Sequence, residues 1–525
     1  MATKKPIKSR DIISVMEDPA MFQPWFEGSS WGNWKTVLKA ATAMPMTEAE
    51  VSFFKSIAGD RNPPKKRVKE IYIIVGRGGG KDSITSGIAA HTAAFFQGRP
   101  KKKIAGIPLP QLRRGEKAMV LALACDRDQA RIVLDYTRSF FTDIEPLRAM
   151  VTRETKTGLE LSNNVEITIA TNDFRSIRGR SILCCIMDEL AFYQSDNTAR
   201  PDQETYRAVM PGLARIPGGM LIAISSPYRR AGLLWKKYKE HFGRDDDDVL
   251  VVMAPSVVMN PTLDQALVAK SIEEDPAANK AEWGYEFRSD LESFVNIDVI
   301  AEAVVNGRHE LEPVLVLGQT YVCAIDAAGG SGGDSFAATI AHRVGDKIVV
   351  DAIREFRPPF SPDAVIEELC RTFLPKYGIK KVWSDKWATG FPTASFRRFN
   401  VDLAFLPKDK STRYLECLQL LNSRSVELLD HKKLVSQFCS LERRPRAGGA
   451  DRVDHPSGPN FHDDISDSCA GAIVMASGLH QVKVTWSAVS VDFSGTGTGV
   501  RSLDGSDGPP DIFAGATEVN LNDLL

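Results

Sequence analysis

One short stretch near the start of the chain, Ile71–Ser83, limits most strongly what this sequence can fold into. It reads Ile-Tyr-Ile-Ile-Val-Gly-Arg-Gly-Gly-Gly-Lys-Asp-Ser. The β-branched and aromatic residues predict a short buried strand, and the glycines predict a loop that few other sequences tolerate. An apolar helix is expected from Ser83 onward. This order of elements can hold nucleotide phosphates, because backbone N–H groups, the positive helix end and Lys81 all face the anion.

The loop departs from the G-x-x-x-x-G-K-[ST] spacing at two positions. Val75 stands where the first glycine would fall, and Asp82 stands where a metal-binding Ser or Thr is expected. Ser83 or Asp82 itself are the candidates for that missing ligand. The alternative interpretation is a glycine-rich turn beside a solvated lysine.

A second apolar strand, Ser181–Asp188, ends in the two acids Asp188 and Glu189. Parallel sheets place such carboxylates at the carboxyl ends of their strands, where sites form. In P-loop ATPases the first acid orients Mg²⁺ and the second activates the attacking water. A strand that ends in Asp-Glu is common, so the signal depends on Lys81 upstream.

Three arginines and a further strand accompany these acids. Arg175, Arg178 or Arg180 could neutralise charge on the γ-phosphate, or could be solvated or bind DNA phosphate. The strand Gly219–Ser226 ends in two hydroxyls, at a position that senses the γ-phosphate in motor ATPases; an ordinary strand exit is the alternative. The repeated β/α pattern predicts a doubly wound, mainly parallel sheet.

The second half of the chain predicts another sheet, with acids at two strand ends. Asp326 ends the first strand, before a glycine-rich turn that carries Asp334, and Asp385 ends the fourth. The first two strands form a hairpin with a carboxylate in the middle of the sheet. The expected elements are strands at 319–326, 336–342, 347–353 and 381–385, and helices at 362–377 and 462–476.

The last helix opens with His462-Asp-Asp-Ile-Ser-Asp467. Asp464 and Asp467 share one helix face, and Asp463 is turned about 100° away. Carboxylates gathered from two strand ends and a helix repel one another unless cations lie between them, as in two-metal phosphodiester hydrolysis with metals ~3.5–4 Å apart. The order of the acids and the hairpin favour an RNase H-like nuclease. Helix-capping and turn aspartates are the alternative.

Several further features bear on DNA and on a nucleotide base. Basic residues between the acids could contact DNA phosphates without sequence preference, or be ordinary surface charge. The aromatic segment Phe22–Phe26, followed by Trp31 and Trp34, predicts either a lid in which Gln23 and an aromatic residue contact an adenine or plain packing. The basic residues are Lys386, Lys408, Lys410, Arg413, Arg443, Arg444 and Arg446.

Composition narrows the class of protein. The 525 residues suffice for two or three domains, and the net charge of −1 excludes a globally basic nucleic-acid binder. Eight cysteines without a C-x-x-C pair indicate thiols in a reducing compartment, and no apolar run reaches membrane-spanning length. We expect a helical lobe at 1–65, an ATPase at 66–270, a connection at 271–315, a nuclease at 316–480 and a flexible tail at 481–525.

An ATPase followed by an RNase H-like nuclease resembles the large terminase subunit of tailed bacteriophages, over about Phe22 to Ala476. The family's Walker A loop is often shortened to G-R-x-x-G-K, which accounts for the missing first glycine. Asp82 remains a departure and leaves the direct Mg²⁺ ligand open. The motifs that carry the resemblance are Gly76–Lys81, Arg178-Gly-Arg180 before Met187-Asp-Glu189, Ile224–Pro227, Ala324–Asp326, Asp385 and His462–Asp467.

The resemblance implies an α/β chain with an N-terminal P-loop ATPase and a C-terminal RNase H-like nuclease that together form a DNA-packaging motor. Such subunits form a ring, commonly of five, on the portal of a procapsid and drive double-stranded DNA inward with ATP. Their nuclease cuts concatemeric DNA, and a small terminase subunit selects the site. The protein would act in the host cytoplasm and transiently at the portal, outside the mature virion and without a membrane.

By the same resemblance, the site residues take specific roles. Lys81 holds phosphate, Asp188 holds Mg²⁺, Glu189 orients water, Ser225 and Ser226 couple hydrolysis to movement, and Arg178 is the candidate arginine finger, in cis or in trans. The nucleotide-binding set is Gly76, Arg77, Gly78, Gly79, Gly80, Lys81, Asp82, Ser83, Asp188 and Ser226. Asp326, Asp385 and Asp464 hold two Mg²⁺ or Mn²⁺ ions, with Asp463 and Asp467 as unranked neighbours.

Two other functions compete with packaging. One is a DNA repair or recombination ATPase-nuclease that works without a capsid. The other is a DNA-binding or portal-docking protein whose ATPase has decayed, for which Asp82 is the suspicious residue. The presence of both Lys81 and Glu189 argues against decay, because an inactive site needs neither.

Overall fold

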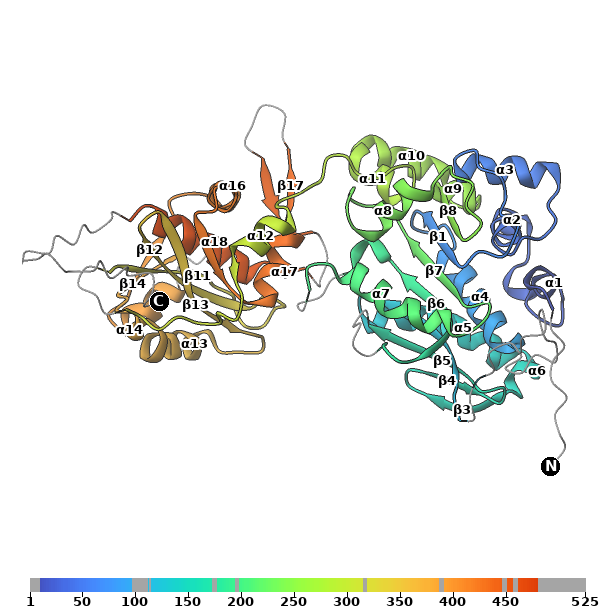
Figure 1. Ribbon diagram of the computed structural model, residues 1–525, viewed down its shortest axis with the longest axis horizontal. Coiled ribbons are helices and arrows are strands. Elements are labelled where there is room, and N and C mark those ends of the chain that lie inside the picture. Colours follow the sequence, from blue (N-terminus) through green and yellow to red (C-terminus); the bar gives the residue numbers. More distant parts are fainter. Residues whose placement is uncertain are drawn as a thin grey trace, which may run out of the picture.

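The computed structural model describes two α/β domains in tandem (Figure 1). The residues it describes are 10–96, 112, 115–171, 177–193, 198–314, 319–386, 391–445, 451–456 and 461–479. The predicted tail, 481–525, and Arg175 and Arg446 lie outside this set. Within it, no helix combines the length and the apolar character needed to cross a bilayer.

The first domain is built on an eight-stranded sheet in the order β3-β4-β5-β2-β6-β7-β1-β8. From β5 to β8 every neighbouring pair is parallel, and β3, β4 and β5 form an antiparallel meander at one edge. The sheet is therefore mainly parallel, as predicted. Its strands are β1 (Glu70–Val75), β2 (Ala118–Ala124), β3 (Val151–Thr155), β4 (Gly158–Leu161), β5 (Val165–Thr171), β6 (Ser181–Asp188), β7 (Met220–Ser225) and β8 (Val249–Ala254).

The central strands are buried on both faces because helices cover each side. In β1, Ile71 and Ile73 belong to one apolar cluster, and Tyr72 and Ile74 belong to another. This burial explains the continuous apolar runs in the sequence. The helices of the domain are α1 (Ile12–Met16), α2 (Gly32–Ala41), α3 (Glu48–Ala58), α4 (Lys81–Phe95), α5 (Arg127–Asp143), α6 (Glu145–Arg148), α7 (Pro201–Ala214), α8 (Gly232–His241), α9 (Ser256–Met259), α10 (Gln265–Glu274) and α11 (Pro276–Glu282).

The aromatic segment near the N-terminus serves packing. Phe22 and Phe26 are almost fully buried, with ring centroids 4.4 and 6.1 Å from that of Phe140 on α5. Gln23 begins a short 3-10 helix and does not line the cavity beside the glycine-rich loop. The structure thus supports packing for Phe22–Phe26, whereas Trp31 and Trp34 line that cavity, so the contact of an aromatic residue with a base stays a prediction.

The second domain has a seven-stranded sheet in the order β10-β16-β13-β12-β11-β14-β15. The three strands β11, β12 and β13 run antiparallel, and β14 and β15 continue parallel to β11. This is the strand order of an RNase H-like domain, as predicted. Its strands are β10 (Val304–Val305), β11 (Tyr321–Asp326), β12 (Phe336–Val344), β13 (Lys347–Phe356), β14 (Lys381–Ser384), β15 (Asp402–Phe405) and β16 (Val426–Leu429).

Helices cover both faces of this sheet. The apolar side of α18 packs with Ala324 and Ala337 on one face, and α13 with the π-helical turn after it packs on the other. The helix predicted from the His462 segment is therefore confirmed as α18. The helices are α12 (Ile297–Ala303), α13 (Pro362–Glu368), α14 (Leu374–Lys376), α15 (Phe391–Arg397), α16 (Lys410–Asn422), α17 (Lys432–Ser440) and α18 (Asp464–Ser477).

The segment expected to connect the domains, 271–315, is divided between them. Up to Arg288 it packs on the first domain, where the Glu282 carbonyl accepts a hydrogen bond from the backbone N–H of Arg77 and Phe287 belongs to an apolar cluster of that domain. Phe294, Val295 and Ile300 belong to the core of the second domain. The polar composition of the segment hid this packing, which depends on a few apolar residues. A small sheet, β18 (Arg452–Asp454), β17 (Glu442–Arg444) and β9 (Glu292–Ser293), joins its middle to the nuclease half.

Candidate functional site

The glycine-rich loop joins β1 to α4 and turns sharply at two glycines. Gly78 and Gly80 have φ of 70° and 91°, the left-handed conformation that a residue with Cβ rarely adopts. Lys81 then begins the helix and is buried; its Nζ donates to the carbonyl oxygens of Val75 at 2.8 Å and Gly76 at 3.1 Å. The ammonium is thus held inside the curve of the loop, where an incoming phosphate would meet it.

Neighbouring elements fix the shape of this loop. The indole Nε1 of Trp34 donates to the Gly79 carbonyl at 2.9 Å, and the Asn260 amide donates to the Gly78 carbonyl at 2.8 Å. Arg77 pairs with Glu282, with Nε 2.8 Å from Oε2. Sequence analysis did not identify Asn260 or Glu282, because neither belongs to a recognisable motif and both are far from the loop in sequence.

A cavity of about 440 Å³ opens beside the loop. Gly78 to Ser83 line one side of it, and aromatic and polar residues from distant elements line the other. Tyr136 is exposed there, and Trp31 is half-buried. The second group consists of Ser30, Trp31, Trp34, Tyr136, Met259, Asn260 and Thr262.

The two acids at the end of β6, Asp188 and Glu189, lie near the end of β7 and Lys81. Because β7 lies between β6 and β1 in the sheet, its last residues stand between Glu189 and the lysine. Glu189 Oε2 accepts hydrogen bonds from Ser225 Oγ and Ser226 N, both at 3.1 Å. Its Oε1 is 3.6 Å from Lys81 Nζ. Four of the residues predicted to form the ATPase site are therefore brought together.

Burial raises carboxyl pKa values in this site. The pKa of Asp188 lies well above its ordinary value because the group is buried and because the charges of Glu189 and Asp82 oppose its ionisation. Burial raises the pKa of Asp82 too, with Glu189 adding to it and Lys81 opposing it. Asp188 Oδ1 is buried with no hydrogen-bond partner among the described residues. These acids and the orphaned oxygen fit a divalent cation such as Mg²⁺.

Arg178 lies near the amino end of β6, whereas the cavity beside the glycine-rich loop lies at the carboxyl ends of the parallel strands. It precedes Ser181, where β6 begins, whereas Asp188 ends the same strand. An eight-residue strand spans about 25 Å. The role in cis is therefore wrong for Arg178, because its side chain cannot cover that distance, and only a role at the site of a second copy remains as a prediction.

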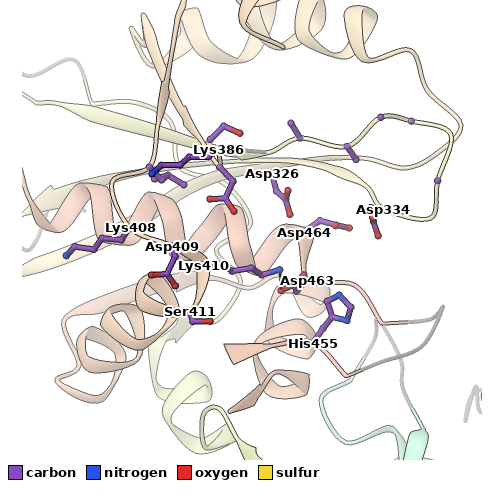
Figure 2. A pocket seen from close by; sticks show the side chains of 18 residues that line it. Asp326, Asp334, Lys386, Lys408, Asp409, Lys410, Ser411, His455, Asp463 and Asp464 are labelled. Carbon is purple, nitrogen blue, oxygen red and sulfur yellow. Dashed lines mark ion pairs between the residues drawn. The ribbon is translucent and has the colours of Figure 1, made fainter. Parts of the chain in front are cut away.

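The second candidate site is a cavity of about 720 Å³ in the second domain. Asp326 at the end of β11, Asp385 after β14 and Asp464 at the start of α18 all line it, together with Asp463. Figure 2 shows Asp326, Asp463 and Asp464 around one hollow, with Lys410 reaching towards Asp463. Asp467 is buried and does not line the cavity.

The acids differ in the partners they have. Asp463 Oδ2 accepts from the Tyr414 hydroxyl at 3.0 Å and lies 2.7 Å from Lys410 Nζ. Asp464 Oδ2 accepts from the backbone N–H of Ser335 at 2.9 Å. Within the described part of the chain, no hydrogen bond or ion pair involves the side chain of Asp326. Asp326 is thus the carboxylate most available to a metal ion.

Burial and mutual repulsion raise the pKa of three of these acids. The pKa of Asp326 lies well above its ordinary value. The group is buried, and the charges of Asp467, Asp464 and Asp463 oppose its ionisation. Burial is the main cause that raises the pKa of Asp464 to about 6, and the same holds for Asp467. Crowded carboxylates of this kind are relieved by a divalent cation.

The acids do not form a closed metal site as they stand. Among the described side chains, no three of His, Cys, Asp and Glu are grouped so that they could hold a metal ion. Oxygen donors from Asp326, Asp385 and Asp464 fit Mg²⁺ or Mn²⁺ in their chemistry. Ion binding would therefore require these side chains to turn towards one another.

The basic residues predicted to contact DNA have separate locations. Lys386, Lys408 and Lys410 line the cavity. Arg443 and Arg444 pair with Asp451 and Glu442 around β17. Arg413 is buried, and its guanidinium contacts Asp385 and Asp467. The groove role is therefore wrong for Arg413, because its charged group does not reach the surface.

Sequence analysis missed several residues that support the acids. Glu355 on β13 accepts from Ser335 Oγ at 2.8 Å and pairs with Lys433 at 2.5 Å. Ser335 in turn holds Asp464 through its backbone. Glu355 could have been identified once the strand register was known. Glu355 and Asp326 both lie opposite Ala337, so their side chains are on the same face of the sheet.

Comparisons with known proteins agree with the first domain. A family described as "Uncharacterized protein MJ0330, N-terminal P-loop domain" matches residues 32–286. That span begins at α2 and ends just beyond α11. None of the curated proteins matches this chain in sequence.

Solved structures similar to this chain include three from phages. The HK97 bacteriophage large terminase is 15% identical, with a TM-score of 0.35, over 82% of this chain and 100% of that one. A large terminase from a thermophilic bacteriophage is 11% identical, with a TM-score of 0.35, over 84% and 98%. The large terminase nuclease from the thermophilic phage G20c with bound magnesium is 14% identical, with a TM-score of 0.29, over 34% and 95%.

Proposed function

We propose that this chain is the motor and nuclease subunit of a viral DNA-packaging machine. It hydrolyses ATP to move double-stranded DNA into a procapsid and cleaves concatemeric DNA by metal-dependent phosphodiester hydrolysis. The observation that carries the proposal is the presence in one chain of two acidic sites. One lies beside a phosphate-binding loop and the other lies on an RNase H-like sheet.

In the ATPase half, the loop residues Gly78–Lys81 bind the outer phosphates of ATP through backbone N–H groups and the lysine ammonium. Mg²⁺ would be held by Asp188 together with Asp82 or Ser83, and when bound it neutralises phosphate charge. Glu189 orients the attacking water and accepts its proton. Ser225 and Ser226 hold that carboxylate, so they couple its position to β7.

In the nuclease half, Asp326, Asp385 and Asp464 would hold two Mg²⁺ or Mn²⁺ ions, which supply hydroxide and stabilise the leaving 3′ oxygen. Lys386, Lys408 and Lys410 line the same cavity and bind DNA phosphates on either side of the scissile bond. Phosphate contacts of this kind are independent of sequence, so site choice falls to a partner.

The proposed partners follow from the packaging role. The subunit assembles as a ring, with five copies expected, on the portal protein of a procapsid in the host cytoplasm. A small terminase subunit supplies DNA-site recognition. In such a ring, Arg178 of one copy reaches the nucleotide of the next.

The test uses the full-length chain in three assays: ATPase activity with and without DNA, plasmid cleavage with Mg²⁺ or Mn²⁺, and nuclease-protected DNA in cognate procapsids. Lys81→Ala and Glu189→Gln should abolish ATP hydrolysis and packaging. Asp326→Asn should abolish cleavage and leave ATP hydrolysis unchanged. Asp346→Asn, at an exposed turn between β12 and β13, is the matched control and should change neither activity.

Other combinations of results in these assays would indicate a different function. DNA-stimulated ATP hydrolysis and cleavage with no procapsid-protected DNA would favour a repair or recombination enzyme. Cleavage without any ATP hydrolysis would indicate a decayed motor. Neither activity, in a protein that melts cooperatively, would overturn the proposal.

A further inference from the structure

We propose that Arg413 is a positioning residue of the nuclease site and that Asp467 is its anchor rather than a metal ligand. The inference rests on the proposed nuclease function. It assigns Asp385 to the metal side of the site and Asp467 to the scaffold behind it. Arg413, anchored by Asp467, thereby holds the carboxylate of Asp385 in place.

The position of Arg413 carries the first step. The residue lies in the first turn of α16, and its side chain is 1% exposed. It is absent from the residues that line the 720 Å³ cavity, although its neighbours Lys410 and Ser411 do line it. A guanidinium in that place cannot reach a DNA phosphate, so its contacts within the protein define its role.

Those contacts join two acids that come from different elements. One terminal guanidinium nitrogen, Nη2, lies 2.8 Å from Asp467 Oδ1 on α18. The other, Nη1, pairs with Asp385 Oδ1 and donates to the Lys408 carbonyl at 3.0 Å. The Nε atom has no hydrogen-bond partner among the described residues, so the two terminal nitrogens provide the anchoring.

The two carboxylates differ in what they face. Asp385 lines the cavity and keeps 27% of its side chain exposed, whereas the Asp467 side chain is 6% exposed and lies behind the cavity wall. Burial raises the pKa of Asp467 to about 6, and Arg413 and Lys410 oppose that rise. A buried carboxylate surrounded by fixed cations already has its counter-charges. Asp385, with one oxygen held and one side exposed, can still accept a metal ion.

Only arginine suits this position. Its planar guanidinium presents two N–H groups at a fixed angle, so one side chain can bind two carboxylates at once. Lysine keeps the charge but concentrates it at one point, and cannot hold both acids in the same geometry. The substitution Arg413→Lys therefore separates positioning from charge.

The experiment measures the full-length protein and three variants. Arg413→Lys tests positioning, Asp467→Asn tests the anchor, and Arg371→Lys is the matched control, since Arg371 is 66% exposed and pairs with Glu367 on the surface. Plasmid cleavage gives kcat and KM for DNA, and electron paramagnetic resonance titration gives the number and affinity of bound Mn²⁺ ions. ATP hydrolysis and a thermal melt report whether each variant folds.

Arg413→Lys should lower kcat by on the order of tenfold to a hundredfold, because a displaced catalytic carboxylate costs this much. Its KM for DNA and its ATP hydrolysis should match the wild type, and Mn²⁺ should bind more weakly. Asp467→Asn keeps an oxygen that accepts from Arg413, so it should bind as many Mn²⁺ ions as the wild type and cleave within about threefold of it. Arg371→Lys should match the wild type throughout.

Three results would contradict the inference in whole or in part. Arg413→Lys that raises only the KM for DNA would make Arg413 a DNA contact, and Asp467→Asn that loses a bound Mn²⁺ ion would make Asp467 a ligand. A wild-type protein that neither cleaves DNA nor binds Mn²⁺ would instead overturn the proposed nuclease function. A wild-type protein that cleaves, beside an Arg413→Lys variant of equal kcat, would refute the positioning role alone.

Discussion

The carboxyl group of Asp464 carries an electrostatic cost in the protein without metal. Its pKa rises to about 6 from an ordinary 3.8, chiefly because it is buried. A raised pKa means that the folded state binds a proton more tightly than the unfolded chain does. The stability that this protonation contributes is full below about pH 3.8 and is lost as the pH rises through about 6.

Asp464→Asn should remove this pH dependence from the nuclease half. The asparagine oxygen can still accept the hydrogen bond from Ser335 N, but the group no longer ionises. At pH 7 without metal, we expect the variant to be more stable than the wild type by about 1–2 kcal/mol. Between pH 7 and 5 the wild type should gain stability relative to the variant.

Urea unfolding in EDTA across pH 4.5–7.5 measures how the free energy of unfolding changes with pH in the wild type and in Asp464→Asn. The exposed Asp346→Asn should follow the wild type. Equal pH slopes for Asp464→Asn and the wild type would show that Asp464 is not strained by burial. In a second measurement without EDTA, added Mn²⁺ should stabilise the wild type and have little effect on Asp464→Asn.

At the scale of elements, the ends of β6 and β7 act as one unit. Glu189 follows β6, and the hydrogen bonds that its side chain accepts come from Ser225 and Ser226 at the end of β7. Ser225 Oγ also accepts from the backbone N–H of Ala191 at 3.2 Å. The hydroxyl of Ser225 therefore connects the two strand ends.

Ser225→Ala should lower kcat for ATP hydrolysis by about tenfold, with KM for ATP little changed, because Glu189 loses a fixing contact and the loop keeps its phosphate contacts. Ser226→Ala is the informative comparison. Its bond to Glu189 comes from the backbone N–H, which the substitution leaves in place, so its loss should be smaller. Steady-state ATPase kinetics measure kcat and KM for both variants. Equal losses of kcat would contradict the role of the Ser225 hydroxyl in fixing Glu189.

A buried ion pair ties α8 and α7 to the start of β1. Lys237 Nζ lies 2.8 Å from Glu70 Oε2 and donates to the Tyr206 hydroxyl at 3.1 Å. Tyr72 and Tyr206 donate to Glu70 at 2.8 and 2.9 Å. The group lies at the edge of the sheet opposite the nucleotide cavity, since it surrounds the first residue of β1.

Lys237→Met should destabilise the first domain by about 3 kcal/mol, because it leaves the buried Glu70 charge without its cation. Its neighbour Lys236 is exposed and pairs weakly with Glu240, so Lys236→Met should cost less than about 0.5 kcal/mol. Chemical unfolding followed by Trp fluorescence compares the two. A small effect in both variants would mean that the pair contributes no net stability.

At the scale of the whole molecule, the contacts between the halves start directly after β7. The Tyr228 hydroxyl donates to Glu442 Oε2 at 3.1 Å, and Arg229 donates to the Ser440 carbonyl at 3.4 Å. Burial raises the pKa of Glu442, which is 0% exposed. The chain that leaves β7, whose last residues bind Glu189, therefore also makes the contacts between the two domains.

Tyr228→Phe should weaken this connection without touching either site. It leaves a buried carboxyl without one donor, which costs about 1–3 kcal/mol. Differential scanning calorimetry should show the two domains melting further apart in temperature than in the wild type, with ATP hydrolysis and basal cleavage unchanged. Tyr285→Phe, which alters an exposed tyrosine, is the control. Unchanged melting would mean that the halves are coupled elsewhere.

Much of the fold could be predicted from local sequence. The strand at 181–188 has the predicted bounds, because a continuous apolar run leaves few alternatives to a buried strand. The acids that end β6, β11 and β14 could be identified as site candidates, because parallel strands present their carboxyl ends at one edge of a sheet. The glycine-rich loop was equally clear, since its left-handed residues demand glycine.

The tertiary structure alone decided which charged residues reach those sites. Arg413 and Lys410 are both basic residues of one helix turn, yet Lys410 lines the cavity and Arg413 is buried against two acids. Those acids lie 28 and 54 residues from Arg413 along the chain. Local sequence determines which elements form, because hydrophobic periodicity acts over a few residues. Burial and ion pairing depend on partners that only the packed fold brings together.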